Sequence, residues 1–164
     1  MRQPFLGYTC SHCGAQYQPH EVQYTCPRDD GNLDVILDYE AIRKDGPQNI
    51  LSSTEQSLWR YLPLLPVNEP GGLGTPLRSV GWTPVYQPPS LLKKLALPRL
   101  WIKDESRNPT ASFKDRASAL VVARAREISA KVVVTASTGN AGAALAGMAA
   151  AVGQRAVIFA PRTA

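Results

Sequence analysis

Hydrophobic and polar positions follow regular periods mainly in the C-terminal part of the chain. Short apolar runs alternate there with longer stretches in which apolar residues recur at helical spacing; in order these are 100–103, 112–130, 132–134, 140–152 and 156–159. The order strand, helix, strand, helix, strand predicts a parallel α/β sheet, here of three strands. Because the run at 132–134 is entirely valine, we expect that strand to be buried on both faces.

The two helices of this region differ in composition. The first is predicted to bury a face formed by Phe113, Leu120, Val121, Ala125 and Ile128. The second is nearly all Ala, Gly, Leu and Met, and its apolar piece has only 12 residues, whereas a bilayer needs about 20. We therefore expect a buried helix of a soluble protein and no contact with a membrane. A sheet that stops after three strands is expected to be the N-terminal part of something larger.

Proline separates this region from the residues before it. Ten of the 14 prolines lie between Pro47 and Pro109, and none lies in 110–160. The segment 41–99 is therefore predicted to be a Pro-rich N-terminal segment and linker, between a small module at 1–40 and a partial α/β domain at 100–164. Within the linker we expect four features: a short helix at 54–65, a loop rich in Pro and Gly, an edge strand at 83–86 and a helical turn at 90–95.

Charge and cysteine content exclude several classes of protein. The 18 basic and 13 acidic residues give a net charge of +5, spread along the chain without a basic stripe, so we do not expect nucleic-acid binding. The first residues lack the apolar core of a secretory signal. Three cysteines, an odd number, favour a reducing compartment and hence the cytoplasm, with a metal or redox use rather than a disulfide framework.

The three cysteines lie in the 1–40 module, in two segments that resemble copies of one tight turn. Cys10 and Cys13 form a C-x-x-C pair, and Cys26 is followed at the same spacing by Asp29. This is the pattern of a zinc ribbon with one ligand changed, in which Asp29 completes the site or His12 or His20 substitutes for it. The alternative is a ribbon that has lost its metal, and three thiols at this spacing favour zinc. A redox role is not expected, because a thioredoxin-like βαβ setting is missing.

A second candidate for chemistry is Lys114, within Asn108-Pro-Thr-Ala-Ser-Phe-Lys-Asp-Arg116. Ser112 followed by Asp115 predicts a capping box, which places Lys114 in the first turn of a helix. The positive end of the helix dipole disfavours an ammonium there, and a neutral amine is what attack on an aldehyde requires. The plainer interpretation is a solvated lysine flanked by ordinary surface charges at Asp115 and Arg116, and local physics alone favours it.

The third candidate is the turn Thr135-Ala-Ser-Thr-Gly-Asn-Ala-Gly142 between a strand and a helix. Small residues let a ligand approach the backbone, and amides at a helix start suit a carboxylate or phosphate. The turn also follows the carboxyl end of a strand, where α/β sheets bind ligands. The alternative is a plain connection capped by Thr138 or Asn140.

Taken together, these motifs resemble the fold type II (tryptophan synthase β-like) pyridoxal-phosphate enzymes, and among them the threonine synthase family most. The resemblance covers residues 75–164 closely. It implies that Lys114 binds the cofactor covalently and moves protons, that Asn140 hydrogen-bonds the cofactor's phenolic oxygen, and that Ser137, Thr138 and Gly139 hold the substrate carboxylate. The implied reaction converts O-phospho-L-homoserine and water to L-threonine and phosphate.

Some features depart from the family pattern. Ala111 and Ala117 stand where the family often has glycine, and the glycine-rich loop that anchors the cofactor phosphate has no counterpart after Lys114. We therefore expect the 164-residue chain alone to bind pyridoxal phosphate weakly and to be inactive. The alternatives are a serine/threonine dehydratase or other β-replacement enzyme, and a non-catalytic module that combines a metal ribbon with an α/β scaffold. The partners expected are a small amino-acid substrate and, as a candidate assembly, a homo-oligomer.

Overall fold

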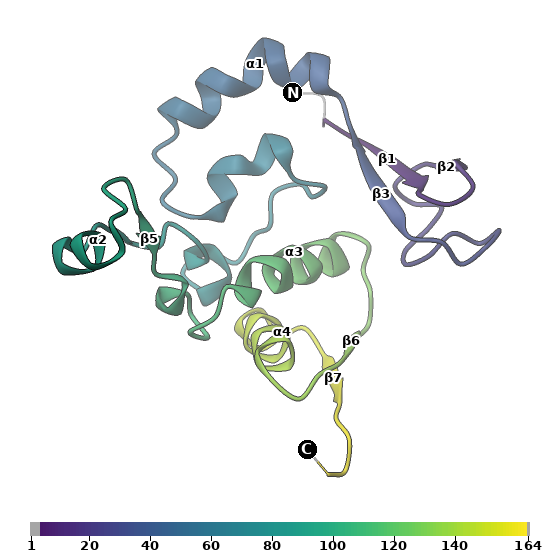
Figure 1. Cartoon of the computed structure of the whole chain (residues 1–164). Helices are drawn as coiled ribbons and strands as arrows, with labels where there is room; N and C mark the ends of the chain where they lie inside the picture. Colours follow the sequence, from purple (N-terminus) through teal and green to yellow (C-terminus); the bar gives the residue numbers. More distant parts are fainter. Residues whose placement is uncertain (1–3, 164) are drawn as a thin grey trace. The chain divides into compact units, whose positions relative to one another are not determined.

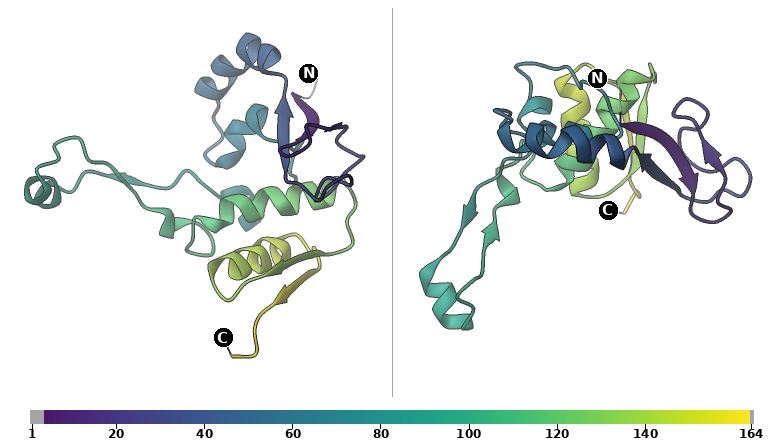
Figure 2. Two further views of the ribbon diagram at one scale, coloured as in Figure 1. Left: turned by 45° about the vertical axis from the view of Figure 1, so that its right-hand side comes forward. Right: turned by 90° about the horizontal axis from the view of Figure 1, so that it is seen from above.

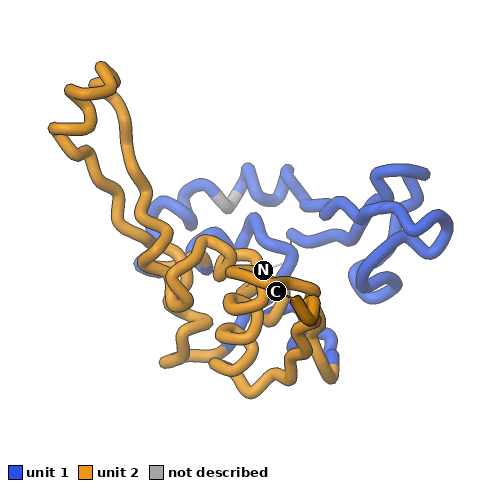
Figure 3. Tube along the Cα trace, turned by 60° about the horizontal axis from the view of Figure 1, so that its bottom comes forward, with its two compact units in different colours: residues 1–55, 59–71, 123–130 blue, residues 56–58, 72–122, 131–164 orange. Residues whose placement is uncertain are grey.

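A computed structural model describes residues 4–163 of the chain. These residues form two compact units, shown in different colours in Figure 3. Among the described residues, unit 1 contains 4–55, 59–71 and 123–130, and unit 2 contains 56–58, 72–122 and 131–163. The predicted boundaries at residues 40 and 99 stay predictions.

Unit 1 begins with a three-stranded antiparallel sheet in the order β2-β1-β3, from β1 (Phe5–Cys10), β2 (Gln16–Tyr17) and β3 (Leu33–Leu37) (Figure 1). Helix α1 (Tyr39–Ser52) follows, and its first turn is capped by the Asp38 carboxylate, which accepts a hydrogen bond from the Ala41 amide at 3.0 Å. The sequence did not predict α1, because Pro47 lies inside it and proline interior to a helix removes a backbone hydrogen bond.

Residues of the linker form short elements rather than one loop. The predicted helix at 54–65 is a 3₁₀ helix, η1 (Leu58–Leu64), and a second one, η2, covers Pro76–Ser79. The predicted edge strand and helical turn are present as β4 (Val85–Tyr86) and α2 (Pro89–Leu95). In unit 2, α2 lies at the far end of the ribbon that β4 forms with β5 (Ile102–Lys103) (Figure 2).

The prediction of a three-stranded parallel sheet is wrong for its first strand, which is β5. β6 (Val133–Ala136) and β7 (Ala156–Phe159) are parallel neighbours, but β5 pairs with β4 and is antiparallel to it. Contacts with residues just before β4 hold β5 there, because the Asp104 amide donates to the Pro84 carbonyl oxygen at 2.9 Å and the Lys103 ammonium donates to the Thr83 carbonyl oxygen at 2.9 Å. A ten-residue loop with a 3₁₀ turn, η3 (Glu105–Arg107), then leads to the next helix, α3.

Helix α4 (Asn140–Ala151) packs against β6 and β7, as predicted (Figure 2). The opposite face of this sheet is exposed, with Val134, Val157 and Phe159 at 55%, 43% and 62% exposure, so β6 is not buried on both faces. No helix among residues 4–163 is long and apolar enough to cross a membrane.

Helix α3 (Lys114–Glu127) buries a face that matches the predicted one only in part: Ala125 is buried, and Leu120 and Ile128 are half-buried. Phe113 and Val121 are exposed, and the buried positions of the helix are Asp115, Ser118, Ala119, Val122, Ala123 and Ala125. The small residues on this face allow close packing, whereas the larger apolar residues that suggested the predicted face lie outside it.

Candidate functional site

Lys114 is the first residue of α3, which confirms that it opens a helix. Its amide donates to Ser112 Oγ at 3.2 Å, and its side-chain nitrogen lies 4.8 Å from the centre of the Phe113 ring. The residue is partly exposed, and its amine lies next to the Phe113 ring. This position suits an amine that must reach a ligand while its backbone is fixed.

The carboxylate next to Lys114 does not form the predicted capping box. Asp115 is fully buried and accepts hydrogen bonds from the Thr110 amide at 2.7 Å and from the Thr110 hydroxyl. The interpretation of Asp115 as a surface charge is therefore wrong. Its helical spacing to the apolar positions Ala119 and Val122 is the signal in the sequence that could have indicated burial.

A polar network fixes the loop before Lys114. Glu105 accepts two hydrogen bonds from the Arg116 guanidinium, each at 2.8 Å, and further ones from Thr83 Oγ1 at 2.7 Å and Asn108 Nδ2 at 2.9 Å. Asn108 in turn accepts from the Gly81 amide at 2.9 Å. The Arg116 guanidinium in particular lowers the pKa of Glu105 to about 2, from an ordinary value of 4.5. The sequence identified the motif at 108–116 but not this network, because Thr83 lies 22 residues before Glu105 and Gly81 lies 27 residues before Asn108.

In the same loop, Ala111 has a left-handed backbone conformation and the Thr110 side chain lies close to helix α4. Ala111 has a φ of +57°, a region that favours glycine, so alanine costs about 1–2 kcal/mol there. This agrees with the glycine that the family often has at this position. One residue earlier in the chain, the Thr110 methyl group packs against α4, where a Cβ added at Gly147 would lie 2.6 Å from Thr110 Cγ2.

We therefore expect Gly147→Ala to lower the free energy of unfolding by about 1–2 kcal/mol, because overpacking against a fixed side chain outweighs the gain in helix propensity. Urea unfolding followed by tryptophan fluorescence measures this change. Thr110→Ser removes the methyl group and keeps the hydroxyl that Asp115 binds, so in that background Gly147→Ala should be stabilising by about 1 kcal/mol. A destabilisation of equal size in both backgrounds would contradict the contact.

The turn after β6 also differs from the plain alternative. Neither Thr138 nor Asn140 caps α4; instead Ser137 Oγ accepts from the Gly139 and Gly142 amides at 3.2 and 2.9 Å. Thr138, Gly139 and Asn140 are exposed at the carboxyl end of the strand. The start of α4 thus presents the exposed Thr138 hydroxyl and the exposed Asn140 carboxamide, both of which can donate hydrogen bonds to an anionic ligand. Within residues 4–163, no hydrogen bond joins Lys114 to this turn.

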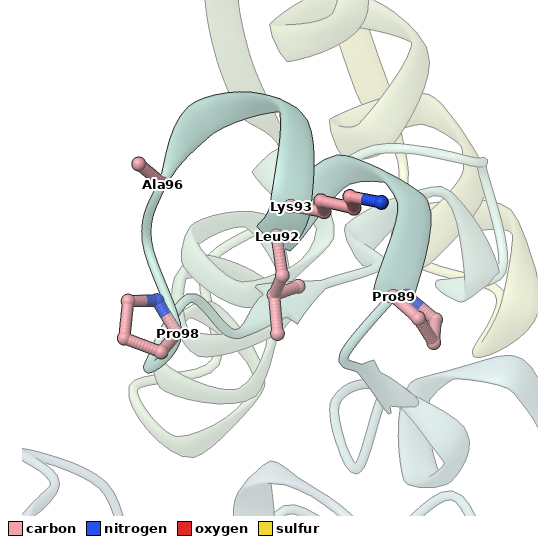
Figure 4. Close-up of a pocket in the computed structure, with 5 residues that line it drawn as sticks. All are labelled: Pro89, Leu92, Lys93, Ala96 and Pro98. Carbon is pink, nitrogen blue, oxygen red and sulfur yellow. The ribbon is translucent and has the colours of Figure 1, made fainter.

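A shallow apolar hollow lies away from both motifs, around α2 (Figure 4). It is lined by Pro89, Leu92, Lys93, Ala96 and Pro98. None of these is a candidate site residue, and the hollow offers one ammonium and no acid–base pair, so we assign no chemistry to it.

The four candidate metal ligands of unit 1 come together as predicted. One ligand atom from each of Cys10, Cys13, Cys26 and Asp29 lies within 4.8 Å of all the others. The Sγ atoms of Cys13 and Cys26 are 3.7 Å apart, and Cys10 Sγ lies 3.4 Å from Asp29 Oδ1. Neither histidine belongs to this group: His12 instead contacts Asp29, with Nδ1 at 3.0 Å from Oδ2.

Hydrogen bonds within this group shift its titration. The bond to Cys26 Sγ raises the pKa of Tyr17 to about 12. Hydrogen bonds from Cys26 and from the Gly31 amide hold the pKa of Asp29 far below its usual range. The Ala15 amide acts to lower the pKa of Cys13, but desolvation and the bonds to Asp29 and the other thiols raise it to about 11. The pKa of Cys26 is lowered instead, because hydrogen bonds from the Tyr17 hydroxyl and the Arg28 amide outweigh its desolvation.

The fold and the motifs at Lys114 and Ser137 define a class of protein. Residues 77–164, more than half of the chain, match the family model of the pyridoxal-phosphate dependent enzymes. The chain therefore belongs to the pyridoxal-phosphate dependent enzyme family, which confirms the fold type II resemblance.

Individual relatives are more specific. The chain is similar to the threonine synthases of Methanosarcina acetivorans, 42% identical over 153 residues, and Methanocaldococcus jannaschii, 39% identical over 152 residues. Each alignment covers 93% of this chain, but only 36% and 37% of those proteins. It is also similar to the cysteate synthase of Methanoregula boonei, 28% identical over 158 residues, which are 92% of this chain and 34% of that protein. The chain thus spans about a third of the length of the curated relatives that it matches.

Proposed function

We propose that this chain supplies the lysine and the substrate-carboxylate turn of a threonine synthase-like lyase, which converts O-phospho-L-homoserine and water to L-threonine and phosphate. The similarity to two threonine synthases over nearly the whole chain is the observation that carries this proposal. The geometry at the two helix starts supports it.

Lys114 is the residue proposed to bind pyridoxal phosphate covalently and to carry protons to and from the substrate carbons. When bound, the cofactor withdraws electrons from those carbons and stabilises carbanions there. The protein's part is to hold the amine ready. The Lys114 amide donates to Ser112 Oγ, which fixes the start of the helix, and the buried Asp115 fixes the preceding loop through Thr110.

The turn at 137–140 is proposed to bind the anionic end of the substrate. Ser137, Thr138 and the Gly139 amide would hold the substrate carboxylate, and Asn140 would hydrogen-bond the cofactor's phenolic oxygen. Exposure of Thr138, Gly139 and Asn140 at the carboxyl end of β6 supports these roles, because such ends are where α/β sheets bind ligands. A homo-oligomeric assembly of the enzyme stays a prediction.

Similarity to a cysteate synthase favours a second candidate function, replacement at the β-carbon of an amino acid. The same lysine and turn would serve either reaction, so the chemistry of the reacting substrate separates the two. Release of phosphate together with L-threonine from O-phospho-L-homoserine supports the first candidate, and its absence alongside turnover of a β-substituted amino acid supports the second.

We expect borohydride reduction in the presence of pyridoxal phosphate to fix a phosphopyridoxyl group on Lys114 of the intact gene product. Peptide mass spectrometry should find this lysine labelled at least tenfold more than Lys103 or Lys131, because the resemblance assigns the covalent lysine to Lys114, the first residue of α3. Asn140→Ala should weaken the selectivity, and Lys114→Arg should remove it while leaving the fold intact. Equal labelling of all lysines would refute the assignment.

A further inference from the structure

The two cysteine segments of unit 1 share one backbone pattern of hydrogen bonds. In the first, the Cys10 amide donates to the Ala15 carbonyl oxygen at 2.8 Å, and the Gly14 amide donates to the Cys10 carbonyl oxygen at 3.0 Å. In the second, sixteen residues later, the Cys26 amide donates to Gly31 and the Asp30 amide to Cys26, each at 2.9 Å.

The matching residues of the two turns also share their backbone conformation. Gly14 has a φ of +71°, and Asp30, at the corresponding position, has a φ of +56°. Asp30 is thus a non-glycine residue in the left-handed region, and its neighbour Asp29 occupies the position that Cys13 has in the first turn. Two turns of this kind present two ligands each, and in this chain the fourth ligand position carries a carboxylate.

From this equivalence we propose that Cys10, Cys13, Cys26 and Asp29 bind one structural zinc ion as a mixed three-thiolate, one-carboxylate site. The ligand atoms are already within 4.8 Å of one another, and zinc accepts both thiolate and carboxylate in a four-coordinate structural site. This proposal is independent of the function proposed for Lys114, because none of the four residues belongs to that site.

Polar groups around the cluster orient its ligands. The amides of His12 and Cys13 point at Cys10 Sγ, at 3.3 and 3.4 Å, and the Tyr17 hydroxyl lies 3.1 Å from Cys26 Sγ. These contacts place partial positive charge beside sulfur, which stabilises thiolates. Partners of this kind orient metal ligands and tune their affinity for the ion.

Asp29 is held from both of its oxygens. The Gly31 amide donates to Oδ1 at 3.0 Å, and His12 Nδ1 lies 3.0 Å from Oδ2. Gly31 also has to lack a side chain, because a Cβ there would lie 2.7 Å from Cys10 Sγ. We therefore assign Asp29 as the ligand and His12 as the residue that positions it.

Purified under reducing conditions without chelators, the chain should contain one zinc per molecule by native mass spectrometry and elemental analysis. Asp29→Ala and Cys13→Ser should each lower zinc affinity at least tenfold in a competition titration with a chromophoric chelator. Asp29→Cys should restore or tighten binding, because it recreates a four-thiolate site. His12→Ala should weaken binding by about tenfold, the lower end of the range for residues that orient a ligand.

The matched control is Asp30→Gly, which removes the adjacent carboxylate and gives the turn the residue that its partner has at Gly14. It should retain one zinc with unchanged affinity. The proposal is overturned if the wild-type chain carries no zinc while Asp29→Cys does, or if Asp29→Ala binds zinc as tightly as wild type. Trapping of a Cys13–Cys26 disulfide in place of the metal under these conditions would overturn it as well.

Discussion

Replacing Asp115 by alanine should lower the free energy of unfolding by about 3 kcal/mol, as measured by urea denaturation. The carboxylate is fully buried and accepts both the amide and the hydroxyl of Thr110. Its removal would leave two partly buried donors without this acceptor, each worth up to about 1–3 kcal/mol, and would open a small cavity.

Two variants separate this effect from a general sensitivity of the loop. Asp115→Asn keeps one acceptor oxygen and the volume, so it should cost about 1–2 kcal/mol. Asp104→Ala removes an exposed carboxylate that caps η3 through the Ser106 amide, and should cost about 1 kcal/mol or less. A loss for Asp115→Ala no larger than that for Asp104→Ala would show that Asp115 does not hold the loop.

Replacing Glu105 by alanine should be destabilising by about 2–3 kcal/mol at neutral pH. The variant leaves the Arg116 guanidinium, which is only 28% exposed, without its bidentate carboxylate, and it also removes the acceptor for Thr83 and Asn108. Glu105→Gln is the matched control for shape, and it should retain part of this stability.

Acid should reproduce the same loss in the wild-type chain. Because folding lowers the pKa of Glu105 from 4.5 to about 2, the carboxylate contributes its full stabilisation above pH 4.5 and loses it progressively as the pH falls towards 2. The difference in unfolding free energy between wild type and Glu105→Gln should therefore shrink over that interval. A difference that stayed constant from neutral pH down to pH 2 would contradict the assignment.

The elements with a clear period could be predicted from the sequence, and the pairing of one strand could not. Valines at 132–134 and the Ala-rich run from 140 indicated β6 and α4 because their local patterns match their final structures. For β5 the pattern gave a strand but not its partner, since pairing with β4 depends on contacts of Asp104 and Lys103 with the loop at 83–84. Helix α1 was not predicted because a proline in the interior of a helix removes a backbone hydrogen bond, yet the chain is helical on both sides of Pro47.

For the candidate site, the sequence identified the residues with chemistry better than those that support them. Lys114 at a helix start and the cysteine spacing follow from local rules, and the structure confirms both placements. The contacts of Thr83 with Glu105 and of Gly81 with Asn108 join residues 22 and 27 positions apart, so neighbouring residues carry little information about them. The burial of Asp115, in contrast, could have been indicated by its helical spacing to Ala119 and Val122. The glycine that the family often has where this chain has Ala111 is a signal that could have indicated the left-handed conformation there.

The parallel pair β6–β7, with its exposed Val134, Val157 and Phe159, has a consequence for handling the protein. Each of its strands has one side unpaired within residues 4–163, next to an apolar face. Unpaired backbone donors and acceptors next to exposed apolar side chains can pair with strands of neighbouring molecules. Concentrated samples of this chain should therefore form aggregates through this sheet, and a charged residue at position 157 should keep them dispersed.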